Sequence, residues 1–183
     1  CALVHVRGAC LHTEWGRRVG EEPARETLET TMPPTPRTLT AEVEIMASPA
    51  RVWSVVSDVR RTREWSPECR RVVVFGAARP GAWFVGFNRR KAVVWATMCR
   101  LVELDEDRVV SWVVQTNRAV WSYRLEAVEG GTRLTETRDM PRGGSPFARW
   151  FTRTFLGGQS DHDDELEVGM LGGLNVIKEL VEG

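Results

Sequence analysis

Alternating apolar and polar residues mark the start of regular structure in this chain. In the stretch AEVEI, apolar side chains at 41, 43 and 45 alternate with glutamates at 42 and 44, which is the period of a half-buried strand. We predict a strand over residues 40–46. Ser48 and Pro49 follow, in the order of an N-cap residue and a proline in the first helical turn. A helix over 49–57 and a second short helical turn over 60–64 are therefore expected.

The segment 69–140 repeats one unit, a strand followed by a turn and another strand. Turn residues such as Asp105-Glu106-Asp107 and Glu129-Gly130-Gly131 separate the apolar runs. Because connections this short join antiparallel neighbours, the sheet is predicted to be an antiparallel meander. The predicted strands cover residues 69–76, 82–88, 92–104, 108–116, 119–128 and 131–140.

One face of this sheet is predicted to be apolar and to need a cover. In VWSYRLEAV, apolar and aromatic residues alternate with polar ones, so one face of the sheet is expected to be solvent-exposed and the other buried. A helix predicted over residues 160–182 supplies the cover, because its apolar positions recur at spacings of three and four. A shorter aromatic helix is predicted within residues 146–155. The stripe of the long helix consists of Leu166, Met170, Leu174, Ile177 and Val181.

The composition indicates one domain and a terminal extension. With 183 residues the chain is long enough for a single domain with its own core. Four of the nine prolines fall within residues 1–38, where no apolar period persists. This segment is predicted to be a disordered or loosely ordered extension, and the folded domain is expected to cover residues 39–183.

The charge balance argues against a nucleic-acid partner. The 25 basic and 25 acidic residues cancel, so no overall field attracts nucleic acid or an acidic membrane. Arginines at 60, 61, 63, 70 and 71 form a local basic cluster, which is expected to be solubilising surface or to pair with acidic side chains.

Cysteine usage and the absence of long apolar runs favour a cytoplasmic protein. The four cysteines show no CxxC spacing, which argues against a zinc site or a disulfide framework and favours buried, reduced thiols. No run approaches the roughly 18 apolar residues that a membrane span requires. His5 and Arg7 interrupt the apolar N-terminal stretch, so we predict neither a signal peptide nor stable membrane insertion.

Motifs for common cofactors and metals are missing from the sequence. It contains no Gly-rich phosphate loop, GxSxG elbow or HExxH motif, so no cofactor is predicted. His162 and Glu165 have a spacing that places an imidazole and a carboxylate together on one helix. One histidine is too few, however, and acidic residues at a helix start suit the positive end of the helix dipole. No metal site is predicted.

Several motifs occur in a fixed order along residues 39–182. A strand is followed by SPARVW, an aspartate near the helix end, EWSP, a late GGTRLTET, and a helix containing GMxxxL. This order resembles the polyketide cyclase/dehydrase branch of the SRPBCC (START/pollen-allergen-like) superfamily. The stretches FVGFNR, residues 84–89, and WATMCR, residues 95–100, resemble actinobacterial members of that branch.

The resemblance implies an α+β helix-grip fold that agrees with the pattern of elements. In this fold a curved antiparallel sheet of about seven strands wraps around a long C-terminal helix, with two short helices after the first strand. The resemblance also implies a deep apolar cavity for a lipid, a polyketide or another hydrophobic small molecule. It leaves the chemistry open, because some relatives are aromatase/cyclases whereas others only carry or sense ligands.

Residues on the apolar faces of the strands and of the C-terminal helix are the candidates for the cavity wall. Large aromatic side chains with a polar edge suit pocket walls, although they serve equally as sheet core or as cross-strand pairs. The candidate set is Trp83, Phe87, Trp95, Trp112, Trp121, Tyr123, Leu134, Glu136, Leu166, Gly169, Met170, Gly173, Leu174 and Ile177.

Two glycines in the predicted C-terminal helix require a reason. Gly169 and Gly173 lie four residues apart, in a helix interior where each glycine costs on the order of 1 kcal/mol relative to alanine. They either permit close packing of the helix or leave room for a ligand. The spacing alone leaves both interpretations open.

Tyr123 and Glu136 are the weak catalytic candidates, and Asn88, Asn117 and Arg138 are further polar residues on or beside strands. Tyr123 shares the parity of inward residues, so its hydroxyl could donate a proton to a ligand or could be satisfied by a backbone carbonyl. Glu136 shares a strand face with Arg138. Glu136 could therefore act as a general base with a perturbed pKa, or it could form an internal ion pair with Arg138.

The preferred functional hypothesis is non-catalytic binding of a hydrophobic or amphipathic small molecule, lipid or polyketide-like, in an internal cavity. The alternative is a polyketide aromatase/cyclase or dehydratase that acts on a ligand in the same cavity. A weaker alternative is an interaction or stress-response module with a vestigial cavity. The protein is expected to be a monomer or a homodimer.

Met32 stands directly before PPTPRTLTAEVEI, so we expect residues 1–31 to be an upstream extension that the fold does not need. A chain that begins at Met32 should then unfold at the same temperature as the full chain. Thermal unfolding followed by circular dichroism checks this, and a large loss of stability would show that the extension belongs to the folded domain.

Overall fold

Seven strands form one antiparallel sheet, and its edges are β1 and β2. The computed structural model describes residues 38–140, 146, 150, 154 and 159–183, with the side chains of 159–163 outside the description. The strand order is β1-β7-β6-β5-β4-β3-β2, and each neighbouring pair is antiparallel. The elements are β1 (Leu39–Ile45), α1 (Pro49–Val56), η1 (Val59–Glu64), β2 (Cys69–Val74), β3 (Trp83–Arg90), β4 (Val93–Asp105), β5 (Val109–Val114), β6 (Val120–Val128), β7 (Gly131–Asp139) and α3 (Gln159–Glu182).

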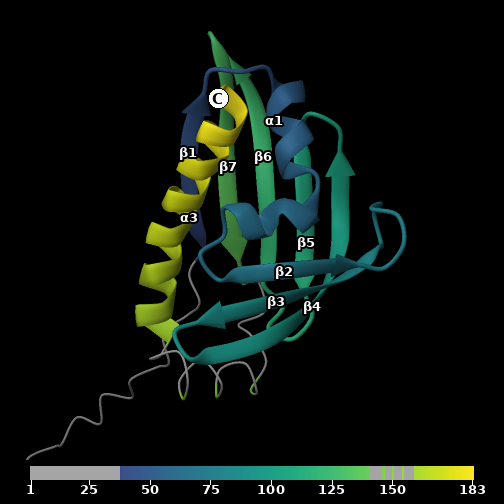
Figure 1. Ribbon diagram of the computed structural model, residues 1–183, viewed down its shortest axis with the longest axis vertical. Coiled ribbons are helices and arrows are strands. Elements are labelled where there is room, and N and C mark those ends of the chain that lie inside the picture. Colours follow the sequence, from purple (N-terminus) through teal and green to yellow (C-terminus); the bar gives the residue numbers. More distant parts are fainter. Residues whose placement is uncertain (1–37, 141–145, 147–149, 151–153, 155–158) are drawn as a thin grey trace, which may run out of the picture. The chain divides into compact units, whose positions relative to one another are not determined.

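This architecture confirms the predicted α+β helix-grip fold. Figure 1 shows that the sheet bends, so that β2 and β3 run across the direction of β5, β6 and β7. The C-terminal helix α3 lies along β1, while α1 packs over β6 and against α3. The short helical segments after β1 therefore close one end of the concave face. The aromatic helix predicted within 146–155 lies outside the described residues, apart from three single positions.

The strand boundaries differ from the predicted ones where turn residues intervene. β2 ends at Val74, two residues before the predicted end, and Gly76 beyond it has a φ of 81° that begins the turn. β5 ends at Val114 rather than at 116, and its connection to β6 includes Arg118 with a φ of 64°. Positive φ values belong to turns and not to strands, and apolar alternation does not reveal them.

The two short helices after β1 are fixed by their first residues and by their apolar positions. Ser48 has an extended backbone, and its carbonyl accepts hydrogen bonds from the N–H groups of Arg51 and Val52. Its side chain makes no capping bond, so Pro49 and the backbone start this helix. Asp58 begins η1, because its carboxylate accepts a hydrogen bond from the N–H of Arg60.

The apolar stripe of α3 is buried as predicted. Leu174 and Ile177 are fully buried in the main core, and Val181 is nearly so. Leu166 and Met170 form a smaller cluster with Leu39 at the beginning of β1. Within the described residues, no helix combines the length and the apolar content that crossing a membrane would need.

Gly169 and Gly173 allow α3 to approach the segment that joins η1 to β2. A Cβ on Gly169 would lie 2.8 Å from Cγ of Pro67, and a Cβ on Gly173 would lie 3.0 Å from the carbonyl oxygen of Trp65. Both distances are too short for an ordinary carbon contact. Close packing is therefore the reason for these two glycines, and neither lines the interior cavity described below.

Gly172 provides a matched control for this packing, because a Cβ there would meet nothing within 4 Å. Gly172→Ala should raise the free energy of unfolding by about 0.5–1 kcal/mol, the helix-interior cost of glycine. Gly173→Ala should lower it, because forcing atoms into a packed contact costs about 1–3 kcal/mol. Urea unfolding of both variants checks the prediction, and equal stabilisation by both would contradict the packing explanation.

Candidate functional site

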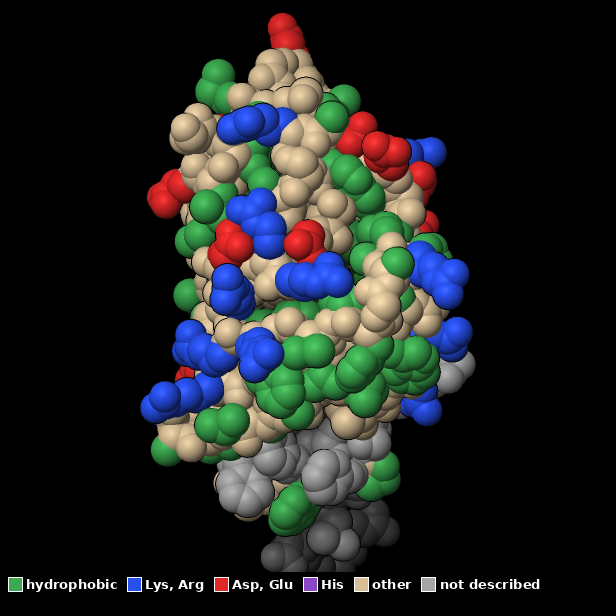
Figure 2. All heavy atoms as spheres, turned by 45° about the vertical axis from the view of Figure 1, so that its right-hand side comes forward, with side chains coloured by type: hydrophobic (Ala, Val, Ile, Leu, Met, Phe, Trp, Pro, Cys, Tyr) green, Lys and Arg blue, Asp and Glu red, His purple; other side chains and the backbone are tan. Residues whose placement is uncertain are grey.

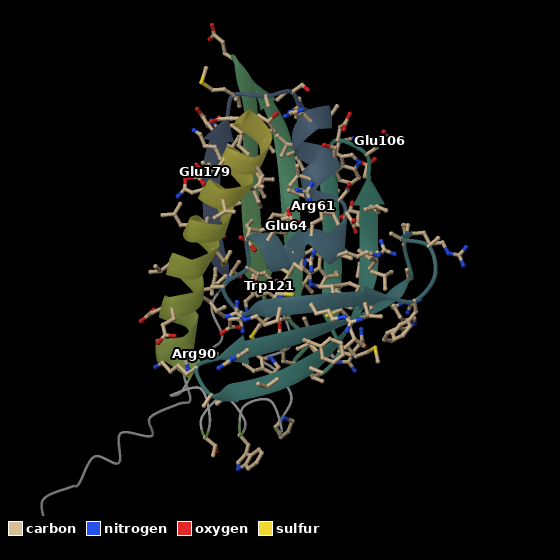
Figure 3. All side chains as sticks on the ribbon, in the orientation of Figure 1. Arg61, Glu64, Arg90, Glu106, Trp121 and Glu179 are labelled. Atoms are coloured by element: carbon tan, nitrogen blue, oxygen red, sulfur yellow. The ribbon has the colours of Figure 1, made fainter. Side chains whose placement is uncertain are left out.

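A cavity of about 360 Å³ lies between the concave face of the sheet and the short helical segments. Its wall combines aromatic and apolar side chains with a smaller number of polar ones. Strands β3, β4 and β5 supply Phe84, Trp95 and Trp112, and the first turns of α3 supply Leu166. Trp121 of β6, labelled in Figure 3, also lines it.

Strand alternation places Tyr123 and Glu136 on this wall. The two residues are direct cross-strand partners in the β6–β7 pairing, so their side chains point to the same face. Both are almost completely buried. The cross-strand register therefore brings a phenol and a carboxyl group together inside the cavity.

A chain of buried hydrogen bonds connects Trp65, Tyr123 and Glu136. The Trp65 indole N–H donates to the Tyr123 hydroxyl at 3.0 Å, and that hydroxyl donates to Oε1 of Glu136 at 2.7 Å. The ring of Tyr123 also meets the rings of Trp65 edge-on at 6.3 Å and of Trp112 at 5.9 Å between centroids. The hydroxyl is satisfied by side chains on both sides, and not by the backbone carbonyl that sequence reasoning considered.

Burial changes the ionisation of this pair. It raises the pKa of Glu136 to about 8, while the hydrogen bond from Tyr123 acts in the opposite direction. Burial also raises the pKa of Tyr123 well above its ordinary value, and the nearby Glu136 adds to that rise. Desolvation disfavours the charged form of both groups. Glu136 is therefore mostly a neutral carboxylic acid at pH 7.

A second acidic residue, Glu68, lines the cavity close to basic side chains. Burial raises its pKa to about 7, and the charges of Arg90 and Arg138 lower it in part. Arg138 is itself buried on the cavity wall. Arg90, labelled in Figure 3, donates from Nε to Oε2 of Glu165 at 2.7 Å and so connects the β3–β4 hairpin to α3. This part of the cavity is polar and carries both signs of charge.

Amides and thiols complete the polar groups of the wall. The Asn88 side-chain amide donates to Oγ1 of Thr97 at 3.2 Å, which orients both groups. Cys69 and Cys99 are buried free thiols that also line the cavity. Burial raises the pKa of Cys99 to about 12, so this thiol is not a nucleophile at neutral pH.

The described residues contain no group of three or more potential metal ligands. The side chain of His162 lies outside the description. Glu165, the other residue of the spacing considered for a metal, makes its ion pair with Arg90 instead.

Comparison with known proteins identifies the family. The model of the family "Polyketide cyclase / dehydrase and lipid transport" matches residues 36–166. The chain belongs to this family. A search of curated proteins finds no match, whereas many solved structures match the chain.

Solved structures agree with the fold of the polyketide cyclase/dehydrase family. A polyketide-cyclase-like protein of Corynebacterium glutamicum is 26% identical, with 82% of this chain and 94% of that one covered and a TM-score of 0.55. The di-domain ARO/CYC StfQ from the steffimycin biosynthetic pathway is 12% identical over 79% of this chain and 50% of that one, with a TM-score of 0.63. A protein of Thermus thermophilus is 15% identical over 79% of this chain and 97% of that one, with a TM-score of 0.60.

The structure brings part of the predicted residue set to the cavity of this family member. The residues from that set on the cavity wall are Trp95, Trp112, Trp121, Tyr123, Glu136 and Leu166. Asn88, Asn117 and Arg138, named as further polar candidates, also line it.

Other members of the predicted set lie elsewhere. Trp83 and Phe87 are on the opposite, outer face of β3 and are each about 40% exposed, because Phe84 and Gly86 occupy the inward positions. The remaining residues form packing contacts and do not line the cavity. These are Leu134, Leu174 and Ile177 in the main core, Met170 in the smaller cluster, and Gly169 and Gly173 against the segment before β2.

Two residues that sequence reasoning did not place in the site are central to it. Trp65 directly follows the short helical segment η1 and belongs to no strand, yet its indole N–H donates a hydrogen bond to Tyr123. Glu68 precedes β2 and belongs to no alternating strand. Neither position belongs to a regular pattern of apolar residues. The only sequence signal was the acidic residue of EWSPECRR that stands between apolar and basic residues.

The raised pKa of Glu136 predicts a pH dependence of stability. Its folded pKa is about 8 and its ordinary value is 4.5, so between these values the folded state keeps a proton that the unfolded state releases. Stability should therefore fall as pH rises from about 4.5 to 8. Glu136→Gln keeps an acceptor for Tyr123 and should flatten this slope in unfolding experiments.

Glu126→Gln is the matched control, because Glu126 is an exposed residue on the neighbouring strand β6. Glu68 contributes the same pH dependence of stability to the wild type and to both variants, so its contribution cancels from the comparison. An unchanged slope in Glu136→Gln would mean that Glu136 is ionised in the folded protein at neutral pH.

Proposed function

We propose that this protein binds an amphipathic small molecule, lipid or polyketide-like, in its interior cavity without changing it chemically. The observation that carries the proposal is a cavity of about 360 Å³ with an aromatic wall and a limited set of polar groups. Sites for small molecules have this character, with volumes of roughly 300–1,000 Å³ and a few polar groups that fix orientation.

The distribution of polar groups supports a ligand with one polar end. Phe84, Trp112 and Val114 give the cavity an apolar wall. Glu68 and Arg138 offer both a carboxyl group and a guanidinium, and Tyr123 with Glu136 offers a hydrogen-bonding pair. A polar end of the ligand would lie beside these groups, and its apolar part would contact the aromatic wall.

The hydrogen bonds of Tyr123 favour binding over catalysis. Its single hydroxyl proton already goes to Glu136, and it accepts a hydrogen bond from Trp65. A general acid must present its proton to the reacting atom. The family description includes lipid transport, which also agrees with a carrier.

Filling the cavity tests the proposal. Thr97 lines the cavity on β4, whereas Thr40 is exposed on β1 and does not line the cavity. Thr97→Phe should weaken binding of the neutral fluorescent probe N-phenyl-1-naphthylamine by roughly tenfold or more, because the added phenyl ring occupies space in the cavity that the probe needs. The matched Thr40→Phe should leave probe affinity unchanged.

Native mass spectrometry of protein purified from its own host provides the second measurement. A co-purified small molecule that Thr97→Phe loses would support the proposal. Equal weakening by both variants would place the probe on the surface. Protein that co-purifies with no small molecule and does not bind the probe would contradict the binding function and favour the interaction-module hypothesis.

A second candidate function is a cyclase or dehydratase, and one observation favours it. Two carboxyl groups with pKa values of about 7 and about 8 line the same cavity, and such values suit proton transfer near neutral pH. For dehydration of a β-hydroxy ketone, Glu68 would take the α proton and Glu136 would protonate the departing hydroxyl, which leaves as water. Loss of water from a β-hydroxy ketone, abolished by Glu136→Gln but not by Glu126→Gln, would select this function over simple binding.

A further inference from the structure

The outer face of strands β2, β3 and β4 is apolar, although it is the face of the sheet that points away from the cavity. Four cross-strand rows cover it, and residues in one row share the same side of the sheet. The rows are Phe75 with Trp83 and Arg100, Val73 with Val85 and Met98, Arg71 with Phe87 and Ala96, and Arg89 with Val94. We call this surface the outer β2–β4 face.

Large apolar side chains are exposed on this face. Phe75 is 56% exposed and Val94 67% exposed, and Trp83, Phe87 and Met98 are each about 40% exposed. An antiparallel sheet normally presents polar residues on the side away from its core. The other half of this sheet does so, since its outward residues on β6 and β7 are Ser122, Arg124, Glu126, Arg133, Thr135 and Thr137. The apolar character is thus local to β2–β4.

The same part of the chain is strongly basic. Residues 69–102 include seven Lys or Arg and no Asp or Glu, although the 25 basic and 25 acidic residues balance over the whole chain. Arg71, Arg89, Lys91 and Arg100 are exposed at or beside the face. Figure 2 shows hydrophobic side chains gathered in a band across the lower part of the view, with Lys and Arg side chains beside it.

Exposed apolar patches of this kind mark interaction surfaces, and the charge identifies the partner. A second copy of this chain is disfavoured, because a two-fold contact would bring two identical basic surfaces together. Stacked nucleic-acid bases are disfavoured, because the Arg100 guanidinium covers the Trp83 ring at 5.7 Å from its centroid. The aliphatic residues Val94 and Met98 also offer no ring on which a base could stack.

We propose that the outer β2–β4 face docks on the surface of a membrane that contains anionic lipids. Tryptophan and phenylalanine side chains fit the boundary between headgroups and acyl chains, and arginines lay their apolar stems there while their charges remain at the headgroups. Exposed basic residues gain affinity from anionic headgroups. The docking is peripheral and requires no membrane-spanning segment.

Docking in this way would place one wall of the cavity at the membrane. Phe84, Gly86 and Asn88 of β3 line the cavity, whereas Trp83, Val85 and Phe87 alternate with them on the outer β2–β4 face. One hairpin thus forms both the cavity wall and the docking surface. The docking does not depend on the proposed ligand, and a protein without cavity binding would still show it.

Vesicle flotation with the full chain tests the proposal. The protein should float with vesicles of 70% phosphatidylcholine and 30% phosphatidylglycerol, should stay in solution with phosphatidylcholine alone, and should be released by added salt. Arg71→Glu combined with Arg89→Glu should reduce partitioning roughly 30-fold or more, because two favourable surface charges are lost. Phe87→Ser combined with Met98→Ser should weaken it without changing the salt dependence.

Arg108→Glu combined with Arg124→Glu is the matched control, because both residues are exposed and lie away from the outer β2–β4 face. These substitutions make the same change in net charge and should leave binding within about twofold of the wild type. Circular dichroism establishes that each variant is folded.

Three outcomes would overturn the proposal. The first is no binding to anionic vesicles, and the second is equal loss of binding in the control variant, which would indicate a general charge effect. The third is binding of single-stranded RNA, or formation of a dimer, that the Arg71 and Arg89 substitutions abolish while vesicles remain unbound. The face would then belong to that other partner.

Discussion

The contact between α3 and the segment Trp65–Pro67 positions both the core and the site. Two glycines of α3 let the helix backbone approach this segment, one against Pro67 and the other against the carbonyl of Trp65. The indole of Trp65 then reaches Tyr123, which donates in turn to Glu136. Helix packing and the ionisation of a buried carboxyl group are thereby connected through a single tryptophan. A side chain at Gly173 would push on the residue that holds Tyr123 in place.

The cavity is the result of an incomplete cover over a curved sheet. The helix α3 lies along β1, and α1 packs over β6, so the concave side of the bent β2–β4 region is not filled by either helix. Several polar groups of that space are buried, and burial raises the pKa values of Glu68 and Glu136. The neutral form of Glu136 reduces the electrostatic cost of a partly apolar interior. This arrangement suits a ligand that is mostly apolar and has one polar end.

The amino-acid pattern predicts the fold well because each element follows a clear period. The acidic alternation in β1 and the apolar stripe of α3 predict two elements that the structure contains. The cavity wall is only partly predictable, and β3 shows why. Its stretch WFVGF is apolar on both faces, so alternation cannot tell which face is inside. Trp65 and Glu68 lie outside regular strands, and their roles depend on distant partners that no local pattern reveals.

A crystal structure of the protein purified from its own host is the most direct test of the central claim, that the space between sheet and helices is held open for a guest. The account predicts continuous density for a ligand or ordered solvent beside Trp112, Tyr123 and Glu136, with the indole of Trp65 bonded to the Tyr123 hydroxyl. Side chains of the sheet collapsed into that space, with no density between them, would contradict it.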